Sequence, residues 1–555
     1  MFSTNSVDKT QISDLKYNIT ELNNFDQLQI LNYTYSVIAH NFATNSGKLN
    51  LTLRDFKYDW IFVTFYTSGN VRCSQGSSNS NLKRALDTSI INCLNDERFG
   101  EKINANEINN LNIDFDILYN KRRTKNPVKD IEPGIHSIEL KQGQKRAIFK
   151  ASVQIAKQFD TATALLQLCK KAQLNNDCYK KKNTSIYIYD TITFNADIQG
   201  NIVDLYRYNL LLTNLTNEDI THSLDLVIGW YQQSIDEEGL LEYEYIPSRD
   251  SYSTSNNHIR KLLSLWAYSE LRLRSNLTIR PIMDKTITYY LNFTTKKDNF
   301  TYLDINGDTN IANSAFIILT LLNENASIDI LKGFGDGILY QQRSDGSYKI
   351  FFGTRNDTGI EFYPGEAMLS LIKLYKRTGD RKYLDSVHKA YYYYSEYWDA
   401  NKNTIMVSWH SQACKLLYDE IKDSNISSFV FRMNDWRITK QQMLKSEYED
   451  QVGGGPIGNP TFSTSTLMEG INEAYALAVS LNDEEHINRY RDSIEKGTRF
   501  ILLTQYNEYN TYYLKNKNRA LGGFRFSLIN NNQRIDYAQH AVFALIKAHD
   551  NMIFG

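Results

Sequence analysis

Several polar segments of the chain contain residue types that transfer protons, bind anions or stack on a flat ligand. These segments lie just before or within stretches of helical periodicity, and they join polar residues to aromatic ones. The candidate acid/base residues are Glu361, Glu366, His410, Asp536 and His540. The candidate substrate-binding residues are His258, Arg260, Tyr363, Trp409, Asp435, Arg525 and Tyr537. Together they predict acid/base chemistry on a glycan or another small polar substrate.

Two glutamates flank a Pro-Gly pair that opens a helix. Glu361 precedes the pair, and Glu366 falls in the first helical turn. Glu366 could simply interact with the helix N-terminus. Beside aromatic residues such as Tyr363, its pKa could instead rise, so that it acts as a general acid. Two carboxyl groups across a cleft are the glycosidase arrangement, but a sequence does not supply their separation.

Two histidines occur in comparable segments. His410 follows Trp409, and His540 ends the run Asp-Tyr-Ala-Gln-His. A histidine in such a place either packs with a hydrogen bond or exchanges protons near neutral pH. Both interpretations stay open for each residue.

The remaining polar candidates are expected to bind or to stabilise. Arg260 and Arg525 can bind an anionic group, while Trp409 or Tyr363 can stack on the substrate. Asp435 lies in a helical stretch that is otherwise rich in apolar residues. If it is buried it needs a partner, so it either belongs to an ion pair or faces a ligand.

The five cysteines are scattered and contain no CxxC pair, which argues against a disulfide framework and a structural zinc site. We therefore expect reduced thiols. Cys73 follows Arg72, which could favour a reactive thiolate, although a half-buried structural cysteine is the alternative. No metal-ligand spacing or phosphate-binding motif is present, so neither a metal nor a cofactor is expected.

The first part of the chain mixes strands and helices. Ile61 to Tyr66 is a short β-rich run that ends at a turn, and Ile113 to Leu118 alternates apolar and acidic residues like a half-buried strand. Leu82 to Leu94 and Ala151 to Leu168 have apolar residues at helical spacing. These patterns predict an α+β domain over residues 1–197.

Several separated segments of this domain resemble the AMMECR domain family in the correct order. They are WIFVTFYTSGNVRCSQGS, LKRALDTSIINCLNDERFG, GIHSIELKQGQKRAIFKASV, LLQLCKKAQL and IYIYDTITF. In the family the cysteine follows Arg-Gly, whereas here Arg72 precedes Cys73 directly. The resemblance implies an α+β fold and a possible protein partner, but no assigned chemistry.

Residues 201–555 repeat a helical hairpin theme. Glu366 to Tyr375 is an amphipathic helix stopped by Arg-Thr-Gly-Asp, and Tyr383 to Tyr397 returns antiparallel to it. At typical helix and loop lengths this part holds about twelve helices, the number of an (α/α)6 toroid. An open superhelical solenoid is the alternative. The Gln, Gly and aromatic turns of residues 201–555 resemble those of toroids in terpenoid cyclases and glycan-processing enzymes.

The composition of the whole chain excludes some classes of function. With 555 residues the chain is long enough for two domains, and a net charge of -1 gives no general attraction for nucleic acid or an anionic membrane. It has no long apolar run to span a bilayer, and its N-terminus does not look like a secretory signal. A cytoplasmic location is therefore expected.

These patterns support three hypotheses. The leading one is a carbohydrate-active hydrolase, epimerase or lyase with acid/base residues at the mouth of the toroid. The second is a non-catalytic scaffold that binds a peptide or protein. The third places the activity in the N-terminal domain, through Cys73.

Overall fold

The computed structural model describes residues 22–42, 53–54, 56–236, 238–274 and 280–554. The chain forms two compact units. The first comprises Met1–Leu211 together with Glu508–Lys517, and the second comprises Leu212–Asn507 and Asn518–Gly555. The first unit is α+β and the second is helical, which confirms the predicted fold class.

The first unit is built on an antiparallel sheet in which the described strands follow the order β2-β1-β3-β6-β4-β5, with β7 paired to the end of β6. The strands are β1 (Trp60–Thr67), β2 (Asn70–Ser77), β3 (Asn112–Thr124), β4 (His136–Gln142), β5 (Lys145–Phe149), β6 (Ser185–Asp197) and β7 (Ile202–Leu205). The helices are α1 (Asn24–Asn41), α2 (Leu82–Leu94), α3 (Pro127–Asp130), α4 (Ala151–Ala156) and α5 (Thr161–Lys171).

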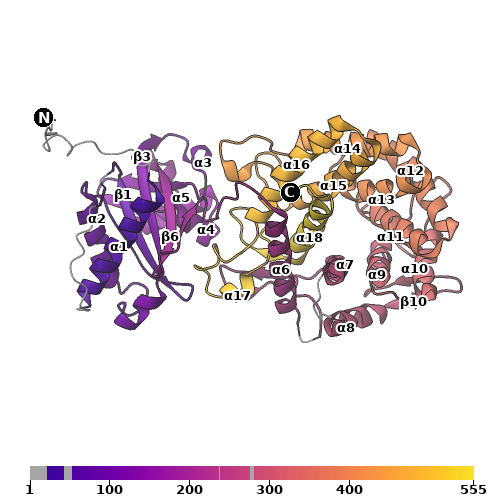
Figure 1. Cartoon of the computed structure of the whole chain (residues 1–555), viewed down its shortest axis with the longest axis horizontal. Coiled ribbons are helices and arrows are strands. Elements are labelled where there is room, and N and C mark those ends of the chain that lie inside the picture. Colours follow the sequence, from indigo (N-terminus) through magenta and orange to yellow (C-terminus); the bar gives the residue numbers. More distant parts are fainter. Residues whose placement is uncertain (1–21, 43–52, 55, 237, 275–279, 555) are drawn as a thin grey trace, which may run out of the picture. The chain divides into compact units, whose positions relative to one another are not determined.

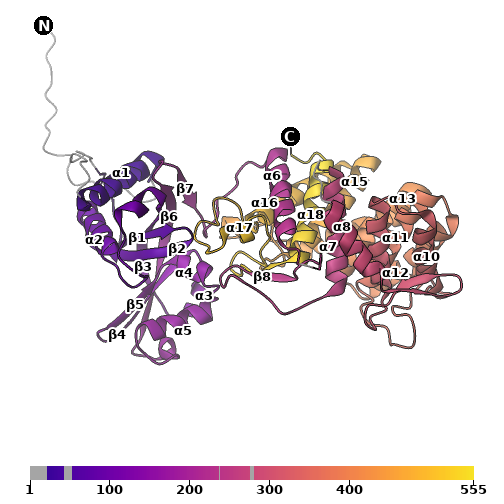
Figure 2. The same cartoon turned by 90° about the horizontal axis from the view of Figure 1, so that it is seen from below.

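Two apolar clusters hold the helices against this sheet. One joins α1 and α2 to the inner positions of β1 and β3, and the other joins α5 to β4 and β5 (Figure 2). The helix predicted for Ala151 to Leu168 is in fact two helices. The chain breaks at Gln158, which has a φ of 54°, and Asp160 then caps α5 by accepting a hydrogen bond from the Thr163 N–H.

The half-buried alternation predicted for β3 was wrong, because its acidic residues are buried too. Asp116 forms an ion pair with Lys150 at 2.7 Å. Asp114 accepts hydrogen bonds from Asn195 and from Tyr512, which belongs to the segment Glu508–Lys517 of the same unit. Burial, and then the neighbouring Asp116, raise the pKa of Asp114. The two carboxyl groups are tolerated inside the unit because each has hydrogen-bonding partners.

The expectation of reduced thiols was also wrong. Cys73 on β2 is bonded to Cys93 on α2, and Cys169 is bonded to Cys178. Spacing along the chain did not reveal these pairs, because the fold brings together cysteines 20 and 9 residues apart. Cys73 is therefore not a reactive thiol, and Arg72 forms an ion pair with Glu107 instead. The cysteines no longer favour a reducing compartment.

The second unit is a closed ring of helical hairpins (Figure 1). Its inner helices are α7 (His258–Arg274), α9 (Ile311–Asn323), α11 (Tyr363–Thr378), α13 (Ile405–Ile421), α15 (Ser463–Leu481) and α18 (Ile535–Asp550). The outer helices are α6 (Asn217–Gln233), α8 (Arg280–Leu291), α10 (Ile328–Tyr340), α12 (Arg381–Ala400), α14 (Ser424–Gln441) and α16 (Glu484–Leu503).

Each inner helix packs against the next, and α18 packs against α7 to close the ring. Among the described residues this gives six inner and six outer helices, so the second unit is an (α/α)6 toroid and not an open solenoid. The predicted stop after α11 is confirmed: Gly379 adopts a φ of 70°, and Asp380 caps α12.

The links between helices carry short elements: α17 (Lys517–Ala520), the hairpin of β10 (Thr294–Lys296) and β11 (Thr301–Leu303), and a small sheet of β8 (Glu244–Ile246), β9 (Ser251–Tyr252) and β12 (Gln533–Arg534). No helix in the described part of the chain is long and apolar enough to cross a membrane.

Candidate functional site

A cavity of about 590 Å³ opens where the N-terminal turns of five inner helices meet. These helices are α7, α11, α13, α15 and α18. Six residues predicted from the sequence line this cavity: Arg260, Tyr363, Glu366, Trp409, Asp536 and His540. We call it the N-terminal cavity. The partial positive charge at each helix N-terminus favours anionic groups within it.

A glycine sets the spacing of two helices at this cavity. A Cβ on Gly365 would lie 2.6 Å from the Cβ of Trp409, so any larger residue would push α11 away from α13. This close approach lets Glu366 and Trp409 line the same cavity.

Glu366 is a buried carboxyl group that forms no ion pair with a described residue. Its side chain is 4% exposed, and Oε2 has no hydrogen-bond partner among the described residues. Burial raises the pKa of Glu366 from its usual 4.5 to about 8. At neutral pH the carboxyl group of Glu366 therefore keeps its proton and can donate it. The alternative role of Glu366 as a helix cap is not supported, because Oε2 accepts no hydrogen bond from a described residue.

His540 is oriented by a second buried glutamate. Its Nδ1 lies 2.7 Å from Oε1 of Glu469, a fully buried residue of α15. Gln412 donates to the other oxygen of Glu469 at 3.2 Å. An ionised Glu469 fixes the proton of His540 on Nδ1, so that Nε2 carries the lone pair of a general base. Trp409 and Phe462 lie near the imidazole, with ring centroids 6.4 and 6.3 Å from it.

Asp536, by contrast, is already neutralised by arginines. Arg534 donates to both of its oxygens at 2.6 and 2.8 Å, and the Nε of Arg260 lies 3.2 Å away. Arg260 also donates to the hydroxyl of Tyr243. These contacts hold Asp536 as a fixed carboxylate at the cavity wall.

One lining residue that sequence reasoning missed is a buried arginine. Arg437, near the end of α14, is 4% exposed, and among the described residues its hydrogen bonds go to neutral oxygens of Ser408 and Thr466. Burial lowers the pKa of Arg437 to about 10, which still leaves it protonated at neutral pH. No sequence signal singled out Arg437 or Glu469, because the buried faces of their helices also contain polar residues such as Asn434 and Asn472.

Three further predicted residues do not line this cavity. His410 is fully buried, its pKa is lowered to about 3 by burial, and its ring packs beside Tyr394. His258 lies 3.3 Å from the hydroxyl of Tyr290. Glu361 lies in the turn before α11 and is absent from the cavity wall.

Another three hold the toroid together. Asp435 forms an ion pair with Arg489 at 3.2 Å and accepts a hydrogen bond from Tyr490, which ties α14 to α16. Arg525 donates to the carbonyl oxygen of Thr504 at 3.2 Å, at the end of α16. Tyr537 packs against Phe462, a residue of the cavity wall, in a tilted arrangement with ring centroids 4.3 Å apart.

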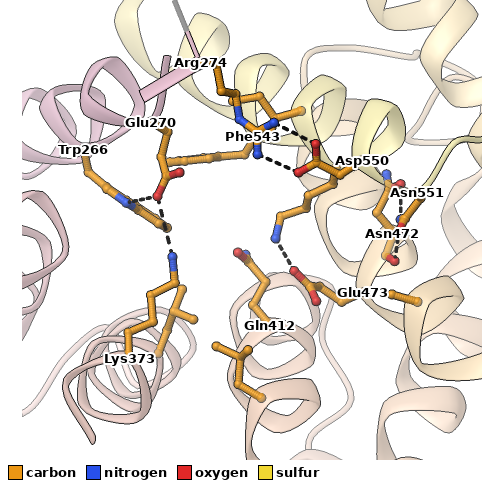
Figure 3. Close-up of a pocket in the computed structure, with 15 residues that line it drawn as sticks. Trp266, Glu270, Arg274, Lys373, Gln412, Asn472, Glu473, Phe543, Asp550 and Asn551 are labelled. Atoms are coloured by element: carbon orange, nitrogen blue, oxygen red, sulfur yellow. Dashed lines mark hydrogen bonds and ion pairs between the residues drawn. The ribbon is translucent and has the colours of Figure 1, made fainter. Parts of the chain in front are cut away.

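A second cavity, of about 250 Å³, lies toward the C-terminal ends of the inner helices. Figure 3 shows its charged side chains joined in pairs. Lys373 lies 3.6 Å from Glu270, Arg274 binds Asp550 at 2.6 Å, and Lys547 binds Glu473. Gln412, the residue that donates to Glu469, also lines this C-terminal cavity. Among the described residues no group of three or more His, Cys, Asp or Glu could hold a metal ion.

The fold and the two cavities define the class of protein: an α+β domain followed by an (α/α)6 toroid with a polar mouth. Residues 31–194 match the AMMECR1 family model. A protein of Caldivirga maquilingensis is 25% identical over 151 residues, which are 26% of this chain and 64% of that relative's length.

Two solved structures are similar to the toroid. A D-mannose isomerase covers 60% of this chain and 97% of its own, at 14% identity and a TM-score of 0.45. An unsaturated glucuronyl hydrolase from Streptococcus agalactiae covers 61% of this chain and 94% of its own, at 14% identity and a TM-score of 0.43. Both superpositions are loose, so the chemistry must be judged from the cavity itself.

Proposed function

We propose that the toroid is a carbohydrate-active enzyme that works by proton transfer in the N-terminal cavity. The observation that carries this proposal is the presence in one cavity of a carboxyl group that keeps its proton and a histidine oriented by a buried carboxylate. Such a pair supplies a general acid and a general base at the same pH. A volume of about 590 Å³ and a wall of aromatic and hydrogen-bonding side chains suit a sugar.

In the reaction that this pair favours, Nε2 of His540 removes a proton from a carbon next to a carbonyl group. Glu366 donates its proton to the carbonyl oxygen, which gives an enediol. Return of the carbon-bound proton to the neighbouring carbon completes an isomerisation, and its return to the opposite face of the same carbon completes an epimerisation. In an elimination the enediol expels the substituent on the next carbon, which takes the proton from His540, and Glu366 recovers its proton from the enol. Tyr363 and Trp409 lie in the cavity wall, where they can contact the sugar ring.

Hydrolysis is less well supported by these residues. It normally uses two carboxyl groups, one of them free to act as base or nucleophile. The other carboxylate of the cavity wall is Asp536, and Arg534 and Arg260 neutralise it.

The experiment is deuterium exchange. The full chain is incubated in D₂O with aldoses, ketoses and uronates, and the C–H signals next to the carbonyl group are followed by NMR. Loss of a signal with wild type but not with Glu366→Gln or His540→Asn supports the proposal, and Glu361→Gln is the matched control outside the cavity. Exchange that survives both cavity variants, or glycoside cleavage without exchange, would contradict it.

The N-terminal unit is proposed as a separate module that binds a protein partner. Cys73 cannot act as a thiol nucleophile in this unit, because it is bonded to Cys93. The cytoplasmic location remains a prediction from the sequence, and the two disulfide bonds weigh against it.

A further inference from the structure

Arg437 is a buried cation of the N-terminal cavity that forms no hydrogen bond or ion pair with a carboxylate among the described residues, although the charge of Glu469 acts on it. Its Nη1 donates to Oγ of Ser408 at 2.7 Å and to the carbonyl oxygen of Thr466 at 3.0 Å. Its Nη2 donates to Oγ1 of Thr466 at 2.7 Å. Its Nε is buried and has no hydrogen-bond partner, and Nη2 keeps a second N–H.

Neutral oxygens can accept hydrogen bonds from a guanidinium group, but they do not cancel its charge. Buried charges in proteins are usually paired, because an unpaired one loses the solvation that water provides. A cation in the wall of a cavity, held in place by two neighbouring helices, is therefore well suited to an anion that arrives from outside.

The other charges of the cavity do not supply that anion. Asp536 is bound by Arg534 and Arg260. Glu469 is hydrogen-bonded to His540 and Gln412, and its charge also acts on Arg437. With Glu366 protonated, the positive charges of Arg260, Arg437 and Arg534 face the carboxylates of Asp536 and Glu469, which leaves one positive charge in excess.

Two helix N-termini add to this charge. Ser408 lies in the first turn of α13 and Thr466 in the first turn of α15, and both line the cavity. The unpaired N–H groups of a first turn favour oxygen anions. Both neutral partners of Arg437 thus belong to elements that attract an anion.

We propose that Arg437, held in place by Ser408 and Thr466, forms a subsite for anionic oxygens through its Nε–H and the second N–H of Nη2, so that the substrate is a sugar bearing a carboxylate or a phosphate group. The inference rests on the proposed function, because the subsite belongs to the same cavity. It names the class of substrate, which the proton-transfer pair alone does not.

The test compares matched sugars by calorimetry on the full chain. The probes are glucose with glucuronate and glucose 6-phosphate, and the corresponding galactose and mannose sets. We expect an anionic member to bind at least tenfold more tightly than its neutral counterpart, with affinity falling as NaCl is raised. The uronate and phosphate arms decide which anion the subsite takes.

Variants then assign the preference to Arg437. Arg437→Gln should remove it, Arg437→Lys should retain part of it, and Arg432→Gln, on the same helix but paired with Asp399, should leave it unchanged. A purely structural brace would lower the melting temperature without changing the ratio of anionic to neutral affinity. If Arg437→Gln does not fold, the wild-type ratio and the lysine variant still decide.

Equal binding of neutral and anionic members, an undiminished preference in Arg437→Gln, or no binding of any probe would overturn the subsite. Its failure is distinguishable from that of the proposed function. Anionic sugars that bind through Arg437 but never exchange deuterium would leave the subsite standing without the chemistry. Neutral sugars that exchange through His540 and Glu366 would leave the chemistry standing without the subsite.

Discussion

The two ends of the helical ring differ in how their charged residues are paired. In the C-terminal cavity each charged lining residue has an ion-pair partner, as in Glu270 with Lys373 and Arg274 with Asp550. In the N-terminal cavity Glu366 and Arg437 are buried, and neither forms an ion pair with a residue that the structure describes. Burying an unpaired charge or carboxyl group costs stability, so a fold keeps such groups where they serve a ligand. The difference separates the end that stabilises the ring from the end that we assign to chemistry.

The largest expected effect comes from removing the base. His540→Asn should lower deuterium exchange by about 10³-fold, within the range for general acid–base catalysis, because Asn cannot accept the proton. The melting temperature should change little. His549→Asn is the matched control, because His549 lies on the same helix but outside the N-terminal cavity, beside Asp550. Comparable losses of deuterium exchange in the two variants would show that the two cavities do not differ in this respect.

Glu366→Gln should separate activity from stability. The folded-state pKa of about 8 lies above the usual 4.5, so the folded chain keeps a proton that the unfolded chain releases. Stability contributed by this group therefore falls as the pH rises from about 4.5 to about 8 and then levels off. The glutamine variant escapes this loss and should be more stable than wild type at pH 8, by roughly 3–5 kcal/mol.

Urea unfolding of both proteins at pH 5 and pH 8 measures this difference. Activity of the wild type should decline above about pH 8, as Glu366 loses the proton that it donates. A stability difference that does not depend on pH would show that Glu366 is not the buried acid.

In the C-terminal cavity, breaking an ion pair should cost stability alone. Glu473→Gln leaves the ammonium group of Lys547 without its partner, and both side chains are mostly buried. We expect a loss of roughly 1–3 kcal/mol in the free energy of unfolding. Deuterium exchange at saturating sugar should stay within about twofold of wild type, and a larger loss would move part of the chemistry to this end.

The smallest effect should come from the residue that joins the two cavities. Gln412→Leu removes the hydrogen bond to Glu469 at 3.2 Å and leaves that carboxylate held by His540 alone. A typical hydrogen bond contributes about 1 kcal/mol, so exchange should fall by roughly three- to tenfold. Exchange equal to that of the wild type would mean that Gln412 does not position the pair.

Much of the fold could be predicted from local patterns. Helical periodicity and stop signals such as Gly379 gave the hairpins, and their number gave the toroid. The same patterns placed Arg260, Glu366, Asp536 and His540 at helix N-termini, which a closed ring gathers at one mouth. Here local sequence sufficed, because the inner helices of the ring point the same way, with their N-termini at one mouth.

Pairings between distant residues were decided only by the tertiary structure. The sequence did not show that Glu469 reaches His540, that Arg534 and Arg260 neutralise Asp536, or that Cys73 is bonded to Cys93. Nor did it show that Arg437 lies in the cavity wall and bonds there to neutral oxygens of Ser408 and Thr466. Local sequence determines which residues form a helix and which face they occupy. Burial and charge pairing depend on neighbours far along the chain, and these neighbours set the pKa values and charges on which the chemistry depends.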